Sequence, residues 1–423
     1  MNKVYVFNLH FNGLGVVRSL GENGIEVVGL DSNYFAIGKY SKYLRKFYKV
    51  TDPSVSERGF INDLILLGNK EKIKPLLVPT NDVWSVAISR YKKELERYFI
   101  VYNPDCSVIE SIINKKIFGS IMTKIGVKTP HTYEINSFAD IYKLKDRLVF
   151  PLIIKPNSRM NVNRNLDVTK LYNANRLITI NSFEEIHQYV KLINNYDFII
   201  QQKNEGLSNR MYTVGIYADQ TSNVLGVFCG RKVRGYPAEY GDCYAGESLW
   251  VDSLVDISKK VIKEIGFTGI AELEFKHNEI DNEYYLIEMN PRTWSWIGIT
   301  PHTGVNLPLI AYNNMLRNYN SYTEMDKTKK VLWVRVLEDS YNCKNNYKGL
   351  NSKDFLTSKK EWRASLSNYD EVVYAEYTTK DKKPLYIYRM ILYIRYLGKL
   401  VNSKQKGNKI WLLAKKLWNY FLK

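Results

Sequence analysis

The sequence predicts a mixed α/β and α+β protein that begins with a doubly wound, Rossmann-like domain. Two patterns carry this prediction. The first is a strand–helix–strand succession over residues 3–30, and the second is a β-hairpin with acidic strands over residues 270–289. The chain of 423 residues is long enough to form two or three domains, each with its own core.

The N-terminal succession starts with a buried-type strand over residues 3–8. Gly13 and Gly15 then open a helical run to about Gly24, and a second strand follows over residues 26–30. A dinucleotide site needs a third glycine in this Gly-x-Gly-x-x-Gly pattern, but Arg18 occupies that position. The pattern therefore predicts a βαβ unit and disfavours NAD as its ligand.

The rest of this first domain alternates in the same way, with a helix over 55–68 and strands over 74–79 and 98–102. Thr80, Asn81 and Asp82 follow the second of these segments, at the end of a strand where open α/β sheets place ligands. They are candidates for substrate contacts, although Asn81 or Asp82 could equally be a helix N-cap. We place the end of the domain near residue 112.

The acidic hairpin pairs two strands, Ile270–Phe275 and Tyr284–Met289. Alternation puts Glu272 and Glu274 on one face of the first strand, and Glu288 and Asn290 on one face of the second. Oxygen ligands gathered in this way suit Mg²⁺, which takes one or two carboxylates and completes its shell with substrate phosphates. The alternative is an ordinary hairpin with solvated acids on its outer face.

Composition and charge limit the other classes of function. The apolar fraction of 45% and the charged fraction of 25% are those of a folded globular protein. The four cysteines show no metal-binding spacing, which predicts reduced thiols in a cytoplasmic protein. No apolar run reaches about 18 residues, so we expect no membrane span.

The net charge of +18 is concentrated at the C-terminus, where residues 382–423 contain eleven Lys and Arg and no acid. The segment 409–423 has the pattern of a basic amphipathic helix. We expect residues 382–423 to contact an anionic membrane surface or a partner, although packing on the body of the protein is the alternative. The charge also raises a nucleic-acid-binding alternative, but the sequence has no recognition motif for it, so no nucleic acid is expected.

Three segments in order, "GIAELEF", "YYLIEMNPR" and "TGVNLP", resemble the metal-binding end of the ATP-grasp superfamily of carboxylate–amine ligases. The resemblance covers residues 1–320. It implies an ATP-grasp fold, in which a doubly wound N-terminal domain is followed by two α+β subdomains that sandwich ATP. The implied division is residues 1–112 for the N-terminal domain, 113–320 for the ATP-grasp domain and 321–423 for a C-terminal extension.

The resemblance also assigns candidate roles to named residues. It implies that Glu274, Glu288 and Asn290 hold Mg²⁺, two ions in this family, and that Arg292 contacts the transferring phosphoryl group. It implies that ATP is bound by two lysines, Lys115 and Lys155, and by a hinge with its polar neighbours, namely Gln201, Gln202, Lys203, Asn204 and Glu205. A basic cluster of Arg231, Lys232 and Arg234 is expected to recognise a carboxylate or the γ-phosphate.

Three departures from the family pattern concern the nucleotide. Asn114 replaces the usual acid before Lys115, and the expected phosphate flap, "SRMNVNRNLD" at 158–167, contains no glycine. The acid expected just after Gly206 for ribose binding is also absent.

The implied activity is ADP-forming ligation of a carboxylate to an amine through an acyl phosphate. The "RKVRGYP" and "EWRASL" segments are similar to the branch that includes the D-aspartate ligases of bacterial cell-wall precursor synthesis. This implies an amino acid and an amine or carboxylate acceptor as substrates, cell-envelope biogenesis as the setting, and a location in the cytoplasm at the inner face of the membrane. An oligomer and a catalytically silent ATP-binding scaffold are the alternatives left open.

Overall fold

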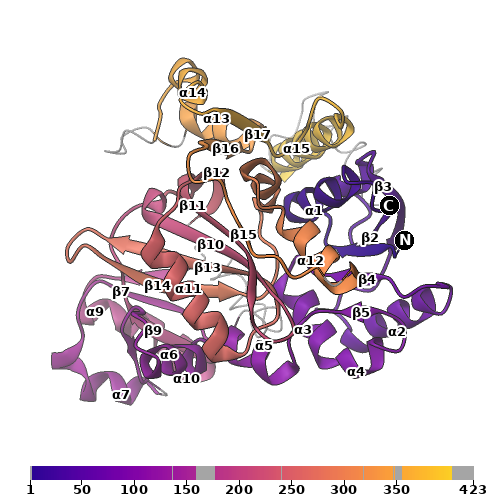
Figure 1. Cartoon of the computed structure of the whole chain (residues 1–423). Helices are drawn as coiled ribbons and strands as arrows, with labels where there is room; N and C mark the ends of the chain where they lie inside the picture. The colour runs from indigo at the N-terminus through magenta and orange to yellow at the C-terminus, as the bar shows by residue number, and fades with distance from the viewer. Residues whose placement is uncertain are drawn as a thin grey trace.

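The computed structural model describes residues 2–135, 137–158, 177–239, 241–317, 319–345, 347 and 355–402, with the backbone alone for 398–402. It contains three β-sheets, each with its own helices (Figure 1). Most of the predicted flap, residues 159–167, lies outside the described residues. The predicted amphipathic helix at 409–423 lies outside them as well.

The first sheet is parallel, with the order β3-β2-β1-β4-β5, and lies on the right of Figure 1. Its strands are β1 Val4–Phe7, β2 Val27–Asp31, β3 Leu44–Lys49, β4 Leu76–Val78 and β5 Ile100–Val101. The helical segments are α1 Phe11–Gly21, η1 Ile37–Tyr40, α2 Glu57–Gly68, α3 Asp82–Arg90, α4 Lys92–Leu95 and α5 Cys106–Ile113.

Both faces of this sheet are buried, which is why β1 reads as a continuous apolar run. Val4 and Val6 pack in one hydrophobic cluster with Leu14 of α1. Tyr5 and Phe7 pack in a second cluster with α2 and α3. Helices on both faces of a parallel sheet make this the doubly wound domain that the sequence predicts.

Gly13 and Gly15 lie inside α1, not in a loop before it. A methyl group on Gly13 would approach the Asn8 carbonyl oxygen to 2.6 Å, and one on Gly15 would approach the Gly298 nitrogen to 3.1 Å. The two glycines therefore allow α1 to pack closely on its neighbours, and Arg18 is buried on the same helix.

The second sheet is antiparallel, with the order β6-β9-β7-β8. Its strands are β6 Thr132–Tyr133, β7 Leu152–Pro156, β8 Ile178–Ile180 and β9 Phe198–Gln202. Its helical segments are α6 Lys115–Lys124, α7 Phe138–Lys143, η2 Lys145–Arg147, α9 Phe183–Ile186, η4 His187–Tyr189 and α10 Val190–Asn195. The Asn114 side chain caps α6, and Gly126 follows it with a φ of 68°, so the predicted start and end are confirmed.

The third sheet is the largest, with the order β14-β13-β10-β11-β12-β16-β17 and β15 paired with β11. Its strands are β10 Met211–Ala218, β11 Val224–Tyr236, β12 Asp242–Ser248, β13 Gly269–Asn278, β14 Glu283–Asn290, β15 Thr323–Glu324, β16 Val331–Val334 and β17 Glu371–Tyr374. The helical segments are η5 Ser208–Arg210, α11 Asp252–Ile265, η6 Ile297–Thr303, α12 Leu307–Arg317, α13 Val336–Asn345, α14 Lys359–Leu366 and α15 Lys383–Asn402.

The central sheet continues past residue 320, because β16 pairs with β12 and β17 pairs with β16. The domain division at 112 and 320 stays a prediction, but β15, β16 and β17 of the predicted C-terminal extension belong to this sheet. Among the described helices, none is both long enough and apolar enough to cross a membrane.

The chain returns to the N-terminal domain after β17. The buried Arg18 of α1 donates to Asp381 at 2.9 Å and to the carbonyl oxygens of Ala375 and Glu376 at 2.8 and 3.1 Å. Tyr388 of α15 is also buried, with its ring 5.0 Å from that of Phe11. Residues 383–397 of the predicted membrane-facing segment therefore pack in part on the protein itself, and contact of 382–423 with a membrane stays a prediction.

Candidate active site

The acidic hairpin places its polar residues in two facing pairs. Glu272 lies opposite Asn290, and Glu274 lies opposite Glu288, in the register of β13 and β14. This confirms the alternation that the sequence predicts. Directly opposite side chains on an antiparallel pair approach closely, so the two carboxylates of the second pair face the same space.

The inner pair is buried and held by hydrogen bonds. Glu272 is 4% exposed and accepts hydrogen bonds from Asn290 Nδ2 at 3.0 Å and from Thr213 Oγ1 at 3.2 Å. Burial, and next the negative charge of Glu274, raise the pKa of Glu272 above its ordinary value. A positive charge brought to this site would relieve that repulsion.

Lys232 of β11 supplies one such charge. Its ammonium group lies 2.6 Å from Glu274 Oε1. Burial disfavours the charge on Lys232, but the carboxylates of Glu274 and Glu272 outweigh burial and raise the Lys232 pKa. Lys232 is therefore a fixed cation at the acidic pair.

A cavity of about 1120 Å³ opens beside the hairpin, between the second and third sheets. Small-molecule sites usually measure about 300–1,000 Å³, so the cavity has room for a nucleotide and a second substrate. Nine predicted site residues line it: Lys115, Lys155, Gln201, Gln202, Lys203, Asn204, Lys232, Glu274 and Glu288. Glu205 is not among the lining residues.

The hinge presents acceptors that the described protein leaves unpaired. The N–H groups of Gln202 and Lys203 donate to the carbonyl oxygens of His131 and Pro151 at 2.9 and 2.8 Å. Within the described residues, the buried oxygens Gln201 Oε1 and Asn204 Oδ1 have no hydrogen-bond partner. Unpaired buried acceptors beside a cavity fit an amino-bearing ring such as adenine.

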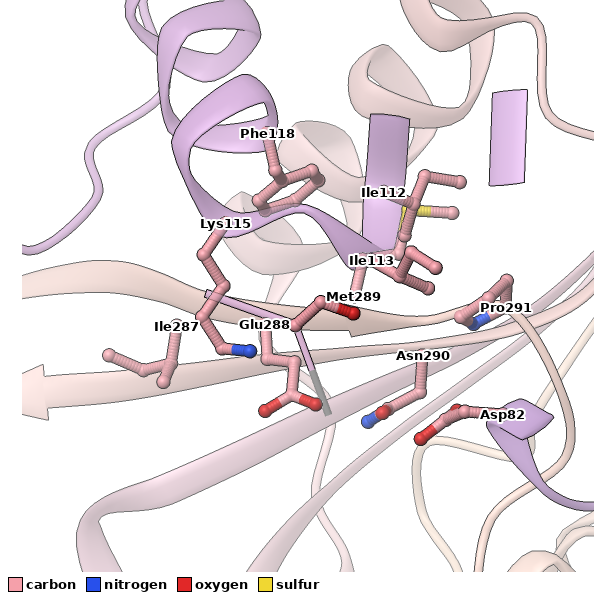
Figure 2. A pocket seen from close by; sticks show the side chains of 11 residues that line it. Asp82, Ile112, Ile113, Lys115, Phe118, Ile287, Glu288, Met289, Asn290 and Pro291 are labelled. Carbon is pink, nitrogen blue, oxygen red and sulfur yellow. The ribbon is translucent and has the colours of Figure 1, made fainter. Parts of the chain in front are cut away.

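A smaller pocket adjoins the cavity at Glu288. Figure 2 shows the Lys115 and Glu288 side chains pointing toward the same space, with Asn290 and Asp82 alongside. Lys115 begins α6 and Glu288 lies on β14, so this pocket joins the nucleotide subdomain to the acidic hairpin.

Arg292 lies just outside the lining residues and is held in place by three neighbours. Its Nε donates to Asp82 Oδ1, its Nη1 to the Thr293 carbonyl oxygen and its Nη2 to Asn290 Oδ1, each at 2.9 Å. Three residues after β4 were candidates for substrate contacts. Of these, Asp82 fixes Arg292, Asn81 caps α3, and the Thr80 hydroxyl donates to the Phe7 carbonyl oxygen. The N-terminal domain thus positions an arginine beside the acidic hairpin.

The segment after Asn290 is anchored by Trp294. Its indole is 1% exposed and stacks on Phe228 with ring centroids 6.0 Å apart. It lies directly over Gly215 of β10, where a Cβ atom would come within 2.1 Å of the Trp294 ring. The backbone that carries Asn290 and Arg292 is therefore fixed against the sheet by this close approach.

Replacing Gly215 with alanine is expected to destabilise the protein by about 1–3 kcal/mol, because the added methyl group must displace the indole from a filled core. Thermal unfolding followed by circular dichroism measures this change. The matched control is Gly119→Ala in α6, where the new methyl group meets nothing within 4 Å and should leave stability equal or higher. A Gly215→Ala protein as stable as the parent would contradict the packing argument.

Two of the predicted basic residues lie away from the cavity. Arg234 is 2% exposed and forms a forked pair with Asp339, at 3.0 Å from its Nε and 2.8 Å from its Nη2. Arg231 pairs with Glu247 at 2.7 Å. A register shift between Lys232 and Arg234 interrupts the strand alternation, so of the three basic residues Lys232 is the one that lines the cavity. The geometry favours a structural role for the other two.

Lys276 is a cavity residue that was not predicted from the sequence, although its spacing gave a signal. It continues the alternation of Glu272 and Glu274 along β13, and it lines the cavity with 8% of its surface exposed. Burial, and next the charge of Lys203, lower the pKa of Lys276 to about 8. Within the described chain no carboxylate lies at ion-pair distance from its ammonium group, so an anionic ligand would be its natural partner.

The donor set also fits Mg²⁺. Two facing carboxylates, Glu274 and Glu288, and the neighbouring amide of Asn290 are the oxygen ligands that this ion takes together with substrate phosphates. Among the described residues no group of three or more His, Cys, Asp or Glu could hold a metal by itself. The site therefore suits a metal that arrives with a phosphate-bearing ligand, not one held by a closed protein cage.

Comparison with known proteins agrees with this geometry. A family described as "ATP-grasp in the biosynthetic pathway with Ter operon" matches residues 230–340, which include the second half of β11 and all of β12, β13 and β14. The N5-carboxyaminoimidazole synthetase of Staphylococcus aureus complexed with ADP superposes with a TM-score of 0.62 and 14% identity, over 82% of this chain and 85% of that one. An L-amino acid ligase from Bacillus licheniformis gives a TM-score of 0.55 at 14% identity, over 75% and 74% of the two chains.

Curated relatives extend the likeness to the whole sequence. The D-aspartate ligase of Enterococcus faecium (strain Aus0004) is 23% identical over 97% of this chain and 93% of its own length. The carbamoyl phosphate synthase large chain of Rubrobacter xylanophilus is 23% identical over 67% of this chain, which spans 26% of that relative's length. The chain therefore resembles proteins of the ATP-grasp superfamily in fold and, over residues 230–340, in sequence. The ligases among these relatives and neighbours indicate an enzyme of the ligase class.

Proposed function

We propose that this enzyme joins the carboxylate of one substrate to the amine of another with ATP, releasing ADP and phosphate. The observation that carries the proposal is the single cavity lined both by the hinge residues Gln202–Asn204 and by the facing acids Glu274 and Glu288. A nucleotide bound at the hinge would direct its phosphates toward these acids.

The chemistry requires activation, because an oxygen of a free carboxylate is a poor leaving group for an attacking amine. The carboxylate oxygen attacks the γ-phosphorus and ADP leaves, which gives an acyl phosphate. The amine nitrogen then attacks the acyl carbon, phosphate leaves with the bonding electrons, and the nitrogen loses a proton to give the amide. Positioning and charge stabilisation are the main contributions asked of the protein.

The described residues divide this task. Lys155 and Lys115 would bind the phosphates of ATP, the hinge would bind adenine, and Arg292, oriented by Asp82, would stabilise charge on the phosphoryl group during transfer. Glu274, Glu288 and Asn290 would hold Mg²⁺, two ions by the resemblance, which would neutralise the β- and γ-phosphates. Lys232 would balance the charge of Glu274.

We infer that one substrate is an amino acid and that the acceptor is a precursor of the cell envelope. The whole-length similarity to a D-aspartate ligase supports the amino acid. The resemblance of the "RKVRGYP" and "EWRASL" segments to the wall-precursor branch supports the acceptor.

Release of ADP tests the proposal. The purified protein with Mg²⁺-ATP is expected to release ADP and phosphate in proportion when one amino acid from a panel of L and D forms is added with a membrane extract as the acceptor source. Product nucleotide is measured by chromatography and phosphate by a colorimetric assay. Release of AMP would contradict the acyl phosphate, and tight ATP binding without any release would favour a silent scaffold.

A further inference from the structure

Helix α15 brings a charged residue of the C-terminal extension to the ligand cavity. Leu385, Tyr388 and Leu397 are buried along this helix, and they fix it against the N-terminal domain beside η1. Arg395 lies two residues before Leu397 and lines the same cavity as Lys155 and Glu288. The family match over residues 230–340 does not include this helix.

Arg395 lies about two helical turns after Tyr388, whose ring is 6.2 Å from that of His10. His10 follows β1 at the start of α1, and its side chain is exposed. The pKa of His10 is lowered to about 4. The largest cause is the removal of water by the protein atoms around the imidazole, and the next is the positive charge of Arg335 and Arg395. Asp242 of β12 acts on His10 in the opposite direction. Arg395 and Asp242 both line the cavity, and the imidazole of His10 is neutral at pH 7 and able to donate one hydrogen bond.

The two arginines that act on His10 differ in how their charges are balanced. Arg335 is 7% exposed, its guanidinium lies over the rings of Phe11 and Tyr244 at 4.5 and 4.4 Å, and it pairs with Glu338. Within the described residues, Arg395 makes no ion pair and is exposed at the cavity. A guanidinium without an internal carboxylate is suited to a forked pair with an oxyanion of a ligand.

The nucleotide already has its own cations in the cavity. Lys115 and Lys155 come from α6 and β7 of the second sheet and its helices, next to the hinge. Arg395 comes instead from a helix packed on the N-terminal domain beside η1. Arg395 therefore enters the cavity from a different part of the fold than the residues expected to bind ATP.

We propose that Arg395 forms a subsite for an oxyanion of the second substrate. The oxyanion is either a carboxylate of an amino acid that the ligation does not consume, or a phosphate of the acceptor. The proposal deepens the proposed function and rests on it. It also gives the C-terminal extension a role in substrate specificity, because the guanidinium that would bind the oxyanion belongs to α15.

Direct binding tests the subsite. Calorimetric titrations use the full chain with a non-hydrolysable ATP analogue present and three separate probes: D-aspartate, L-aspartate and inorganic pyrophosphate. Arg395→Ala is expected to weaken one class of probe about 10- to 100-fold and to leave the affinity for the ATP analogue within about twofold. Arg395→Lys should recover part of the lost affinity, because it retains the charge without the fork.

The matched control is Arg389→Ala, which removes an arginine from the exposed surface of the same helix but outside the cavity lining, and which should bind every probe like the parent. If Arg395→Ala loses affinity for the aspartates alone, the subsite binds a carboxylate. If it loses affinity for pyrophosphate alone, the subsite binds a phosphate. The proposal would be overturned if Arg395→Ala bound every probe like the parent, or if it lost affinity for the ATP analogue alone. It would also be overturned if the parent protein bound none of the three probes. Arg395-dependent binding in a parent that releases no ADP would support the subsite and refute the ligase activity.

Discussion

Replacing Glu288 with glutamine is expected to lower the rate of ADP release at least about 100-fold. The change keeps the size of the side chain but removes one of two carboxylates that face each other across β13 and β14. A glutamine would leave the Mg²⁺-bound phosphates with one negative ligand fewer, so the transferring group would lose charge compensation. Initial rates at increasing Mg²⁺ measure the effect, and the variant should also need more Mg²⁺ for half of its maximal rate.

The control for this experiment lies on the same strand. Glu283 begins β14, is exposed and pairs with Lys128 at 2.9 Å, far along the strand from Glu288. Glu283→Gln removes the same charge from β14 and should retain the parental rate. An unchanged rate and Mg²⁺ requirement in Glu288→Gln would remove Glu288 from the site.

The second large effect is expected for Arg234→Ala, which should destabilise the protein by about 3–5 kcal/mol. The variant leaves the Asp339 carboxylate buried, with Trp362 Nε1 at 2.7 Å but without its cation. Chemical unfolding measures the loss. At a temperature where the variant is folded, its affinity for ATP should match that of the parent, because Arg234 does not line the cavity.

The control for removing this buried ion pair is Arg58→Ala, which removes an exposed one. Arg58 also forms a two-bonded pair, with Glu94, but its side chain is 53% exposed. Water screens such a pair, so its removal should change stability little. If Arg234→Ala lost activity while keeping full stability, the role of Arg234 at the substrate would be restored and our structural interpretation would be wrong.

Local rules explain what the sequence could predict. The facing of Glu274 and Glu288 follows from the two-residue period of a strand, and the burial of one face fixes the register. The limits of α6 follow from the Asn114 cap and from Gly126, whose left-handed backbone ends a helix without strain. These signals lie within a few residues of the feature that they specify.

What the sequence could not show concerns contacts between distant residues. The cluster of Arg231, Lys232 and Arg234 looks uniform in sequence, but a register shift and a partner at Asp339 separate its members. Residues 382–397 look like a surface-binding tail because they are basic. Leu385 and Tyr388 of this segment are nevertheless buried, and Tyr388 packs against Phe11, more than 350 positions earlier. Arg395 could not be found as a cavity residue for the same reason.

The ion pair between Arg18 and Asp381 has a consequence for how the protein is made. The two residues are 363 positions apart, so a ribosome that adds about 5–20 residues per second produces Asp381 roughly 20–70 s after Arg18. Throughout that interval the first domain emerges with a guanidinium whose buried partners do not yet exist. The nascent first domain therefore lacks these partners of Arg18 until residue 381 has been translated.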